Sequence, residues 1–366
     1  MLCFNNRNIT VQEYDKNSLI LNRRLPLPLN SPSDFPINGW RLSHAIAMTI
    51  SSRNLYNTEY WLDAIASNLG LSSLIDRHSP NIRINSKRIE SLRDFSRTSR
   101  IGETSQGTVY LYLEKNGYPY IVDFHIFCKN RGITIPPKSS TPDFVAQNQI
   151  ASNQLCLVES KGKETTSSGS FKTKLKKALS QCDSGEQIIN NNGYYNVTKK
   201  FGFCAEWSDE NNDDDSMLHW VDPENEVNRI KDNDSVLKLH YAAWFYMIGD
   251  FRNSKNLMNG KSIEISTLSE IFIDDNKYFI PDGFPNLEDF SIKDDIFSSG
   301  FFEIFSLIRF INRNPINFLP AISETVVRYL EKSETQISPK MNFESFSSED
   351  FEFFADGTAI IKKPNE

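Results

Sequence analysis

Residues 142–162 of this chain read PDFVAQNQIASNQLCLVESKG, and this stretch decides the fold. It opens with Asp143 in its second position and closes on an apolar run that ends in Glu159, a serine and Lys161. Side chains alternate between the two faces of a strand, so Glu159 and Lys161 are expected on the same face. Asp143 lies beside them if the two segments pair as a hairpin. Two carboxylates can bind a hard divalent cation, and the ammonium group adds a second positive charge beside it. This combination of groups is suited to the hydrolysis of a phosphodiester.

This combination occurs once in the chain. A second Pro-Asp pair stands at residues 281–282, and a second acid-x-Lys triplet stands at residues 275–277. Only Asp143 and the triplet at residues 159–161 have the right order with a short gap, and only this triplet follows an uninterrupted apolar run. The alternative interpretation is an ordinary strand that ends in solvated charges. The neighbouring segments favour the functional interpretation.

The segment before this stretch predicts a helix. Residues 102–115 read GETSQGTVYLYLEK and carry apolar side chains at helical spacing. Asn-Gly at residues 116–117, followed by Pro119, is a helix stop, because Gly tolerates the left-handed conformation and Pro cannot continue a helix. A strand is the alternative for the Val-Tyr-Leu-Tyr run, but the length of the span favours the helix.

The remaining elements complete an α/β unit. Residues 120–127 (YIVDFHIF) are rich in β-branched and aromatic residues and predict a strand, and residues 144–146 and 155–160 predict the next two. Residues 171–190 carry apolar side chains on one helical face, and residues 201–207 predict a fourth strand. The order is helix, three strands, helix and strand, which is typical of a three-layer α/β fold with a mixed sheet.

This order, with Pro142-Asp143 on the second strand and Glu159-Ser160-Lys161 on the third, resembles the PD-(D/E)xK nuclease superfamily. That superfamily includes restriction endonucleases, RecB-type exonucleases and Holliday-junction resolvases. The resemblance covers residues 100–207 and implies a restriction-endonuclease-like core of three α-β-α layers. It also implies a phosphodiester hydrolase that uses Mg²⁺ or Mn²⁺, with a DNA endonuclease in restriction or anti-phage defence as the expected function.

The resemblance assigns roles to individual residues. Asp143 matches the metal-binding aspartate, Glu159 matches the second acidic ligand, and Lys161 matches the lysine that orients or activates the attacking water. Many members add a metal-binding glutamate from the first helix, and Glu103 stands at that place. Its alternative role is that of an exposed acid at a helix N-terminus.

Some members of the superfamily also place a catalytic glutamine on the helix after the lysine. Gln181 lies in the matching predicted helix, and its alternative role is that of a surface polar residue. The RecB-like Gln-x-x-x-Tyr pattern is absent, because Gly185 stands where the tyrosine would be.

Basic side chains flank the proposed catalytic unit. Residues 77–100 carry seven basic and two acidic residues, and residues 161–177 carry six lysines and one acid. We expect contacts to the phosphates of a nucleic acid, most naturally DNA, because such contacts are made by Lys and Arg near the metal. A solvated charged face is the alternative. The residues expected to touch the backbone are Arg93, Arg97, Arg100, Lys163, Lys172, Lys174, Lys176 and Lys177.

Composition sets further bounds. The net charge of −7 over 366 residues argues against a protein that coats DNA with its whole surface. The five cysteines form no Cys-x-x-Cys and predict reduced thiols in a cytoplasmic protein. No apolar run is long enough to predict a membrane span, and residues 1–14 lack the apolar core of a signal peptide. The five histidines show no ligand spacing that would predict a zinc site.

The sequence predicts three regions. Residues 1–75 form a mostly helical N-terminal region with helices over 40–52 and 59–69. Residues 76–260 form the nuclease-like core, which includes a strongly apolar helix over 236–248. Residues 261–366 form an α-rich, Phe-rich accessory region that is expected to bind a partner protein or a second copy of the chain. Helices are expected there over the ranges 301–311 and 326–332.

Two other functions remain open at this point. A catalytically silent nuclease-like module would bind nucleic acid or a partner protein, but it would be expected to lack one of the ligands, and all three residues are present. An RNA-directed nuclease would use the same chemistry. Nothing in the sequence separates RNA from DNA.

Overall fold

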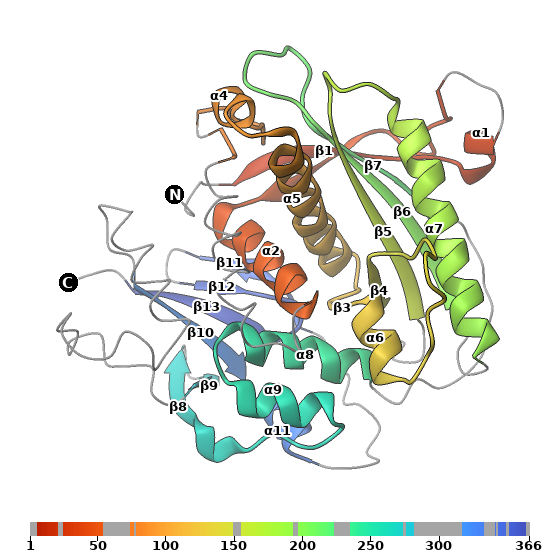
Figure 1. The fold of residues 1–366 in the computed structure, drawn as a ribbon. Helices are drawn as coiled ribbons and strands as arrows, with labels where there is room; N and C mark the ends of the chain where they lie inside the picture. Colours follow the sequence, from red (N-terminus) through yellow and green to blue (C-terminus); the bar gives the residue numbers. More distant parts are fainter. Residues whose placement is uncertain are drawn as a thin grey trace.

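Seven strands from both halves of the chain form one mixed sheet at the centre of the computed structural model (Figure 1). Two pairs of neighbours in this sheet are parallel, and the others are antiparallel. Across the sheet the strands are β2 (Ser33–Ile37), β1 (Arg7–Glu13), β7 (Met217–Val221), β6 (Val197–Trp207), β5 (Leu155–Glu164), β4 (Phe144–Gln147) and β3 (Tyr120–Asp123). The predicted α/β class with a mixed sheet is therefore confirmed.

The structure describes most of the chain, with gaps. The described residues are 6–20, 25–53, 74–76, 78–148, 155–192, 197–222, 235–273, 276–281, 317–332, 341, 343–348 and 351–363. The helices predicted over 59–69 and 301–311 lie outside these ranges. No helix in the described ranges is both long enough and apolar enough to cross a membrane.

Helices cover both faces of the sheet. α5 (Asp94–Lys115) lies on one face of β5 and α7 (Phe171–Asn191) lies on the other, as Figure 1 shows. Glycines permit both close approaches. A Cβ atom at Gly162 of β5 would lie 2.5 Å from Ser105 Oγ of α5, and one at Gly185 of α7 would lie 2.6 Å from Pro142 Cδ. Any larger residue at either position would push a helix away from the sheet.

Six shorter helices of the described ranges complete the core, and the first of them in the chain packs against α7. They are α1 (Lys16–Ile20), α2 (Gly39–Arg53), α4 (Ser86–Glu90), α6 (Phe124–Asn130), α8 (Ser235–Met247) and α9 (Phe251–Met258). α2 contacts both α5 and α8, and α8 contacts β3. α2 and α8 confirm the helices predicted over 40–52 and 236–248.

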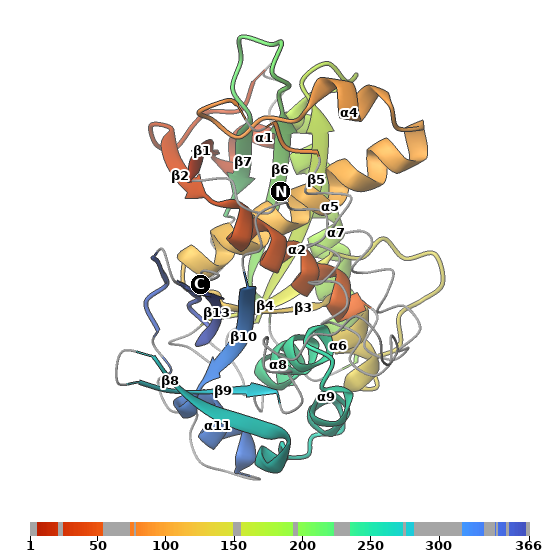
Figure 2. The same ribbon diagram turned by 90° about the vertical axis from the view of Figure 1, so that its left-hand side faces the viewer.

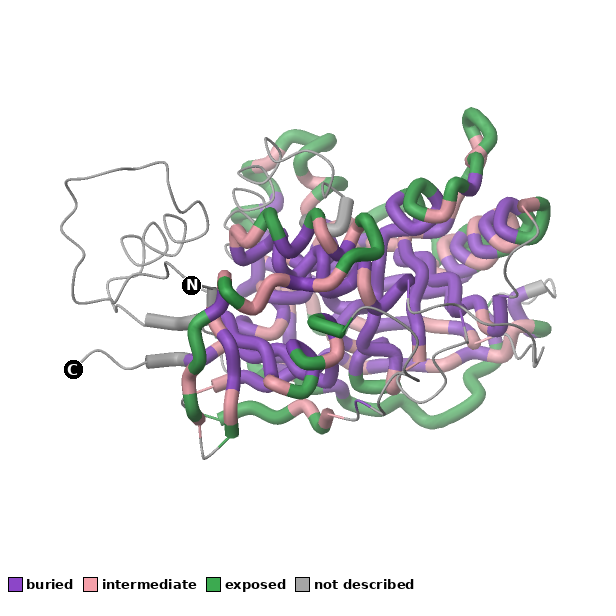
Figure 3. The backbone as a smooth tube through the Cα atoms, turned by 90° about the horizontal axis from the view of Figure 1, so that it is seen from below, coloured by how far each residue is buried: buried purple, intermediate pink, exposed green. Residues whose placement is uncertain are grey.

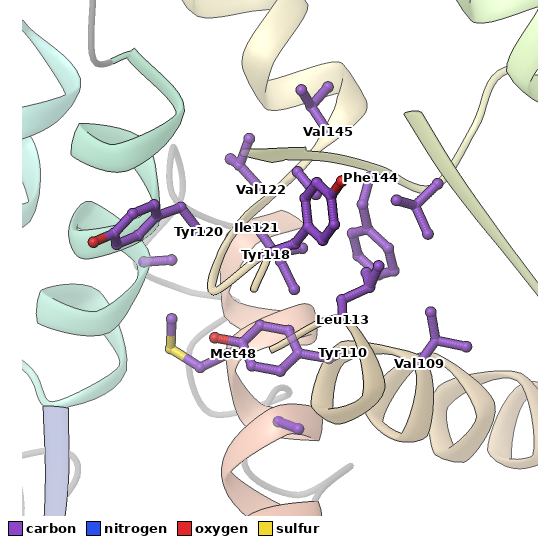
Figure 4. Packing of buried hydrophobic residues seen from close by; sticks show 14 of the residues in the cluster. Met48, Val109, Tyr110, Leu113, Tyr118, Tyr120, Ile121, Val122, Phe144 and Val145 are labelled. Carbon is purple, nitrogen blue, oxygen red and sulfur yellow. The ribbon is translucent and has the colours of Figure 1, made fainter. Parts of the chain in front are cut away.

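Apolar side chains join these layers into one core. In Figure 4, Val109 and Leu113 of α5 lie close to Phe144 of β4, and Met48 of α2 lies beside Tyr110 of α5. Val109 and Phe144 are fully buried, and burial of a side chain of this size stabilises the fold by about 1.5–3 kcal/mol. The buried tube in Figure 3 accordingly runs through the middle of the molecule, with exposed segments around it.

A second sheet follows the core in sequence. Its strands are β11 (Phe346–Ser347), β12 (Phe351–Phe353), β13 (Thr358–Lys363), β10 (Asn317–Ser323), β9 (Asn276–Pro281) and β8 (Leu268–Ile273), in this order. The short 3₁₀ helix η2 (Ile265–Thr267) precedes it, and α11 (Glu324–Glu331) confirms the helix predicted over 326–332. In Figure 2 this sheet lies below the central sheet.

The end of β12 and the turn that follows it are bonded to three helices of the core. The backbone N–H of Ala355 donates to Glu114 Oε1 of α5 at 2.7 Å. His240 Nε2 of α8 lies 2.8 Å from Asp356 Oδ2, and Arg41 of α2 donates to the carbonyl of Phe353 at 3.0 Å. The second sheet is therefore fixed to the core by buried polar bonds.

The structure corrects four sequence predictions. The strand expected over 120–127 ends at Asp123, whose side chain accepts a hydrogen bond from Ile126 N and so begins α6. The helix expected from residue 102 begins at Asp94. Residues 1–75 are not a separate helical layer, because β1 and β2 join the central sheet. The described part of residues 261–366 is dominated by strands instead of helices.

Candidate active site

The β4–β5 hairpin brings the three predicted catalytic residues together. The two strands pair antiparallel with Phe144 opposite Val158, so the next position in the register sets Asp143 opposite Glu159. Asp143 Oδ2 accepts a hydrogen bond from the backbone N–H of Ser160 at 3.0 Å. The hairpin that the sequence predicted is therefore present, and its carboxylates are neighbours.

Strand alternation orients the side chains. Gly162 faces α5, and Leu157 lies against Gly185 of α7, so the odd-numbered residues of β5 point toward α7. Glu159 and Lys161 share this face. Lys161 Nζ forms an ion pair with Glu159 Oε1, and the Lys161 side chain keeps 20% of its surface exposed. The lysine can therefore reach solvent and the carboxylate at the same time.

Glu159 is the most perturbed acid of the site. It is 1% exposed, and its Oε2 has no hydrogen-bond partner within the described part of the chain. Burial, and next the charge of Asp143, raises the pKa of Glu159 to about 8, although Lys161 opposes this shift. A buried oxygen that lacks a partner costs about 1–3 kcal/mol. The site therefore has a strong preference for a proton or a cation at this oxygen.

Gln181 is bonded to the segment that carries Asp143. Its Nε2 donates to the carbonyl of Thr141 at 2.7 Å, two residues before Asp143. Its Oε1 is buried and has no hydrogen-bond partner among the residues that the structure describes. The Gln181 amide nitrogen therefore holds the segment that carries Asp143, and the amide oxygen Oε1 is available as an acceptor beside this segment.

Glu103 does not join these carboxylates. α5 begins two turns earlier than the sequence predicted and covers the opposite face of β5, so Glu103 lies in mid-helix. Its carboxylate contacts Ser99 Oγ at 3.2 Å and Arg100 at 3.3 Å. Across the described ranges, no group of three or more His, Cys, Asp or Glu side chains is placed to hold a metal ion. Within the described ranges, Asp143 and Glu159 are the acidic pair of this site.

The predicted phosphate-binding residues fall into two groups. In the first group, three of the four residues form ion pairs with acids of the protein. Arg97 forms a bidentate ion pair with Glu164, Lys163 is buried and pairs with Glu206, and Arg100 contacts Glu103. Lys172 is also buried, with 8% of its surface exposed. Three of these side chains are engaged in ion pairs and the fourth is largely covered, so their expected contacts to phosphates stay a prediction.

The second group is accessible. Arg93, Lys176 and Lys177 are exposed and Lys174 is half-buried, and these four form no ion pair with any described residue. Lys174 and Lys177 lie seven and four residues before Gln181 on α7, which places all three on one side of the helix. Lys174 and Lys177 therefore form a basic row on the side of α7 that carries Gln181, the residue bonded to the Asp143 segment.

Sequence reasoning missed a buried polar chain beside the site. Lys163 pairs with Glu206 Oε1, His219 Nε2 lies 3.1 Å from Glu206 Oε2, and the Tyr14 hydroxyl lies 3.0 Å from His219 Nδ1. Burial lowers the pKa of His219 and raises the pKa of Tyr14 to about 12. These residues come from four strands or strand ends, and no local pattern in the sequence connects them.

Comparisons with known proteins give no assignment. The chain matches no protein-family model, and no match is found among curated proteins or solved structures. The site must therefore be interpreted from its own geometry.

Proposed function

We propose that this protein is a metal-dependent nuclease, most specifically a DNA endonuclease, with Asp143, Glu159 and Lys161 as its catalytic residues. One observation carries the proposal: Glu159 is a buried carboxylate, next to Asp143 and ion-paired with Lys161, and its Oε2 has no hydrogen-bond partner among the described residues. An ordinary strand end would expose these charges to water. Keeping them together in the interior is costly unless a ligand compensates.

The donor set fits Mg²⁺ or Mn²⁺. Both candidate ligands are carboxylates, which hard divalent cations prefer, and a cation would satisfy Glu159 Oε2, for which no described residue supplies a hydrogen bond. When bound, the ion would neutralise phosphate charge and acidify a water molecule. Asp143 is held in position by the N–H of Ser160, and Lys161 presents a positive charge to the phosphate or the attacking water.

The accessible basic residues support a nucleic acid as substrate. Lys174 and Lys177 would contact phosphates on the way to the site, while the net charge of −7 would limit binding elsewhere on the protein. We propose DNA, and cleavage of RNA is the competing outcome. Restriction or anti-phage defence in the cytoplasm is the setting that this class of enzyme suggests.

A cleavage assay tests the proposal. Purified protein is incubated with closed circular plasmid and with structured RNA, in Mg²⁺, in Mn²⁺ and in EDTA. We expect plasmid cleavage that requires the metal and is abolished by Lys161→Ala, Glu159→Gln and Asp143→Asn, each with a melting temperature near wild type or higher. Retained cleavage by Lys161→Ala would remove the assignment. Binding of DNA without any cleavage would favour the catalytically silent module.

A further inference from the structure

One histidine is bonded to the segment that carries Asp143. His125 is the second residue of α6, and the backbone N–H of the preceding Phe124 donates to the carbonyl of Asp143 at 3.0 Å. His125 Nε2 itself lies 3.0 Å from Thr141 Oγ1. Two bonds, one from the backbone and one from the ring, therefore connect the start of α6 to residues 141–143.

Thr141 is held from two sides. Its hydroxyl meets His125 of α6, and its carbonyl accepts the bond from Gln181 of α7. Gln181 lies on the same side of α7 as Lys174 and Lys177. Thr141 therefore connects His125 of α6 to Gln181 of α7, and so to the side of α7 that carries Lys174 and Lys177.

The ring of His125 is exposed, unlike its neighbours. Phe124, Ile126 and Phe127 are all buried, whereas His125 has an exposed surface. Its Nδ1 has no hydrogen-bond partner among the described residues. When the Thr141 hydroxyl donates to Nε2, Nδ1 carries the ring hydrogen of the neutral imidazole and becomes a donor. The geometry thus presents one oriented N–H to solvent at the border of the site.

We propose that His125 is a substrate-binding residue of this site, which donates a hydrogen bond from Nδ1 to a phosphate oxygen of the bound nucleic acid. The inference rests on the proposed nuclease function. It adds a contact on the α6 side that neither the acidic pair nor the lysines of α7 supply. Thr141 is a positioning residue in this arrangement, since it sets the orientation of the ring.

Two substitutions separate substrate contact from a structural role. Asn places an amide nitrogen near the position of Nδ1, and Gln places one near the position of Nε2. If His125 contacts the substrate, His125→Asn keeps most of the cleavage rate, while His125→Gln loses about 10- to 100-fold, the usual worth of a hydrogen bond to a charged group. If His125 only holds Thr141, the order of the two variants is reversed.

The control is another exposed histidine. His78 lies in the loop before α4, and His78→Gln removes an exposed imidazole with no expected effect on cleavage. Binding of a labelled oligonucleotide in EDTA, measured by fluorescence anisotropy, gives a second readout, in which His125→Gln weakens affinity and His125→Asn does not. A rate and an affinity at wild-type level in His125→Gln overturn the inference, and so does an equal loss in both variants.

The two proposals fail differently. If wild-type protein cleaves DNA and Lys161→Ala does not, the nuclease function stands. The His125 variants then test only the proposed contact between His125 and the substrate. If wild-type protein cleaves no nucleic acid under any of the metal conditions, the nuclease function and the role of His125 are both rejected.

Discussion

Glu159 is buried and forms an ion pair with Lys161, and its Oε2 accepts no hydrogen bond from any described residue. Each property alone is common in proteins. Together they store unfavourable electrostatic energy at a fixed place, because a charge in the interior is stabilised only by close partners. The residue is therefore poised to exchange a proton for a cation, and its protonation should be visible in the stability of the metal-free protein.

The metal-free protein is expected to lose stability as pH rises. The folded-state pKa of Glu159 is raised from 4.5 to about 8, so its contribution to stability is fully present below about 4.5 and is lost as pH rises through about 8. In EDTA, the melting temperature of Glu159→Gln should therefore exceed that of wild type increasingly between those limits. Differential scanning fluorimetry across this range measures the difference in melting temperature. At the alkaline end it is expected to correspond to a difference in unfolding free energy on the order of a few kcal/mol.

Mg²⁺ supplies the matching check on the same residue. At pH 8, added Mg²⁺ should raise the melting temperature of wild type, because binding to the folded state alone stabilises it. Glu159→Gln should respond much less, since an amide is a weak ligand. A pH dependence identical in wild type and variant would place the perturbed acid elsewhere.

At the scale of elements, α7 connects substrate binding to the site. Its first turns carry the accessible lysines, its middle carries Gln181, and Gly185 lets it lie against Pro142. This helix was predictable from its apolar spacing, and so was the hairpin of β4 and β5. The pairing state of each basic residue was not, because Glu164 and Glu206 reach Arg97 and Lys163 only after the strands have been aligned.

Charge reversal on α7 should weaken binding to any DNA sequence. The double variant Lys174→Glu, Lys177→Glu is expected to lower affinity and to reduce the slope of log affinity against log salt by about 2, since each phosphate contact contributes about 1. Anisotropy titrations at several salt concentrations measure both quantities.

The control variant carries the same change in net charge at a distance from α7. It is Lys255→Glu, Lys261→Glu, at two exposed positions in and just after α9. Its salt slope should equal that of wild type. An equal loss in the two double variants would mean that DNA responds to total charge alone, and the α7 row would lose its assigned role.

The errors at this scale have physical causes. Residues 124–127 have the aromatic and β-branched composition of a strand, yet Asp123 caps a helix there, because a bond to Ile126 N outweighs the weak local preference. The sequence predicts Glu103 near a helix start, since it shows no apolar periodicity between Asp94 and Ile101. Exposed first turns of a helix contain little such signal.

For the whole molecule, the second sheet is bonded to the core through the turn after β12. Glu114 is buried, and burial raises its pKa to about 7, with Arg41 opposing this shift. Its Oε1 accepts the N–H of Ala355 at 2.7 Å. Sequence alone could not reveal this bond, because the two residues are far apart in the chain and neither belongs to a motif.

Removal of this acceptor should loosen the second sheet. Glu114→Ala leaves the Ala355 N–H buried without its partner and is expected to cost about 1–3 kcal/mol of unfolding free energy. Glu114→Gln keeps an acceptor oxygen at the same place and should stay close to wild type. Chemical denaturation gives the free energies, and hydrogen exchange at Ala355 should accelerate in the alanine variant only. Unchanged exchange in Glu114→Ala would mean that the turn is held by Asp356 and Phe353 alone.

The parallel pairing of β1 with β7 has a consequence for biosynthesis. Thr10 of β1 pairs with Met217 of β7, so an early strand must wait for a partner made some two hundred residues later. Until then, the emerging chain exposes an unpaired strand edge, which is the kind of surface that invites aggregation and that chaperones cover. The antiparallel partner β2, only two dozen residues away, can protect the other edge of β1 in the meantime. The order in which the ribosome delivers these strands thus favours a provisional β1–β2 hairpin, which docks onto the central sheet once β7 has left the exit tunnel.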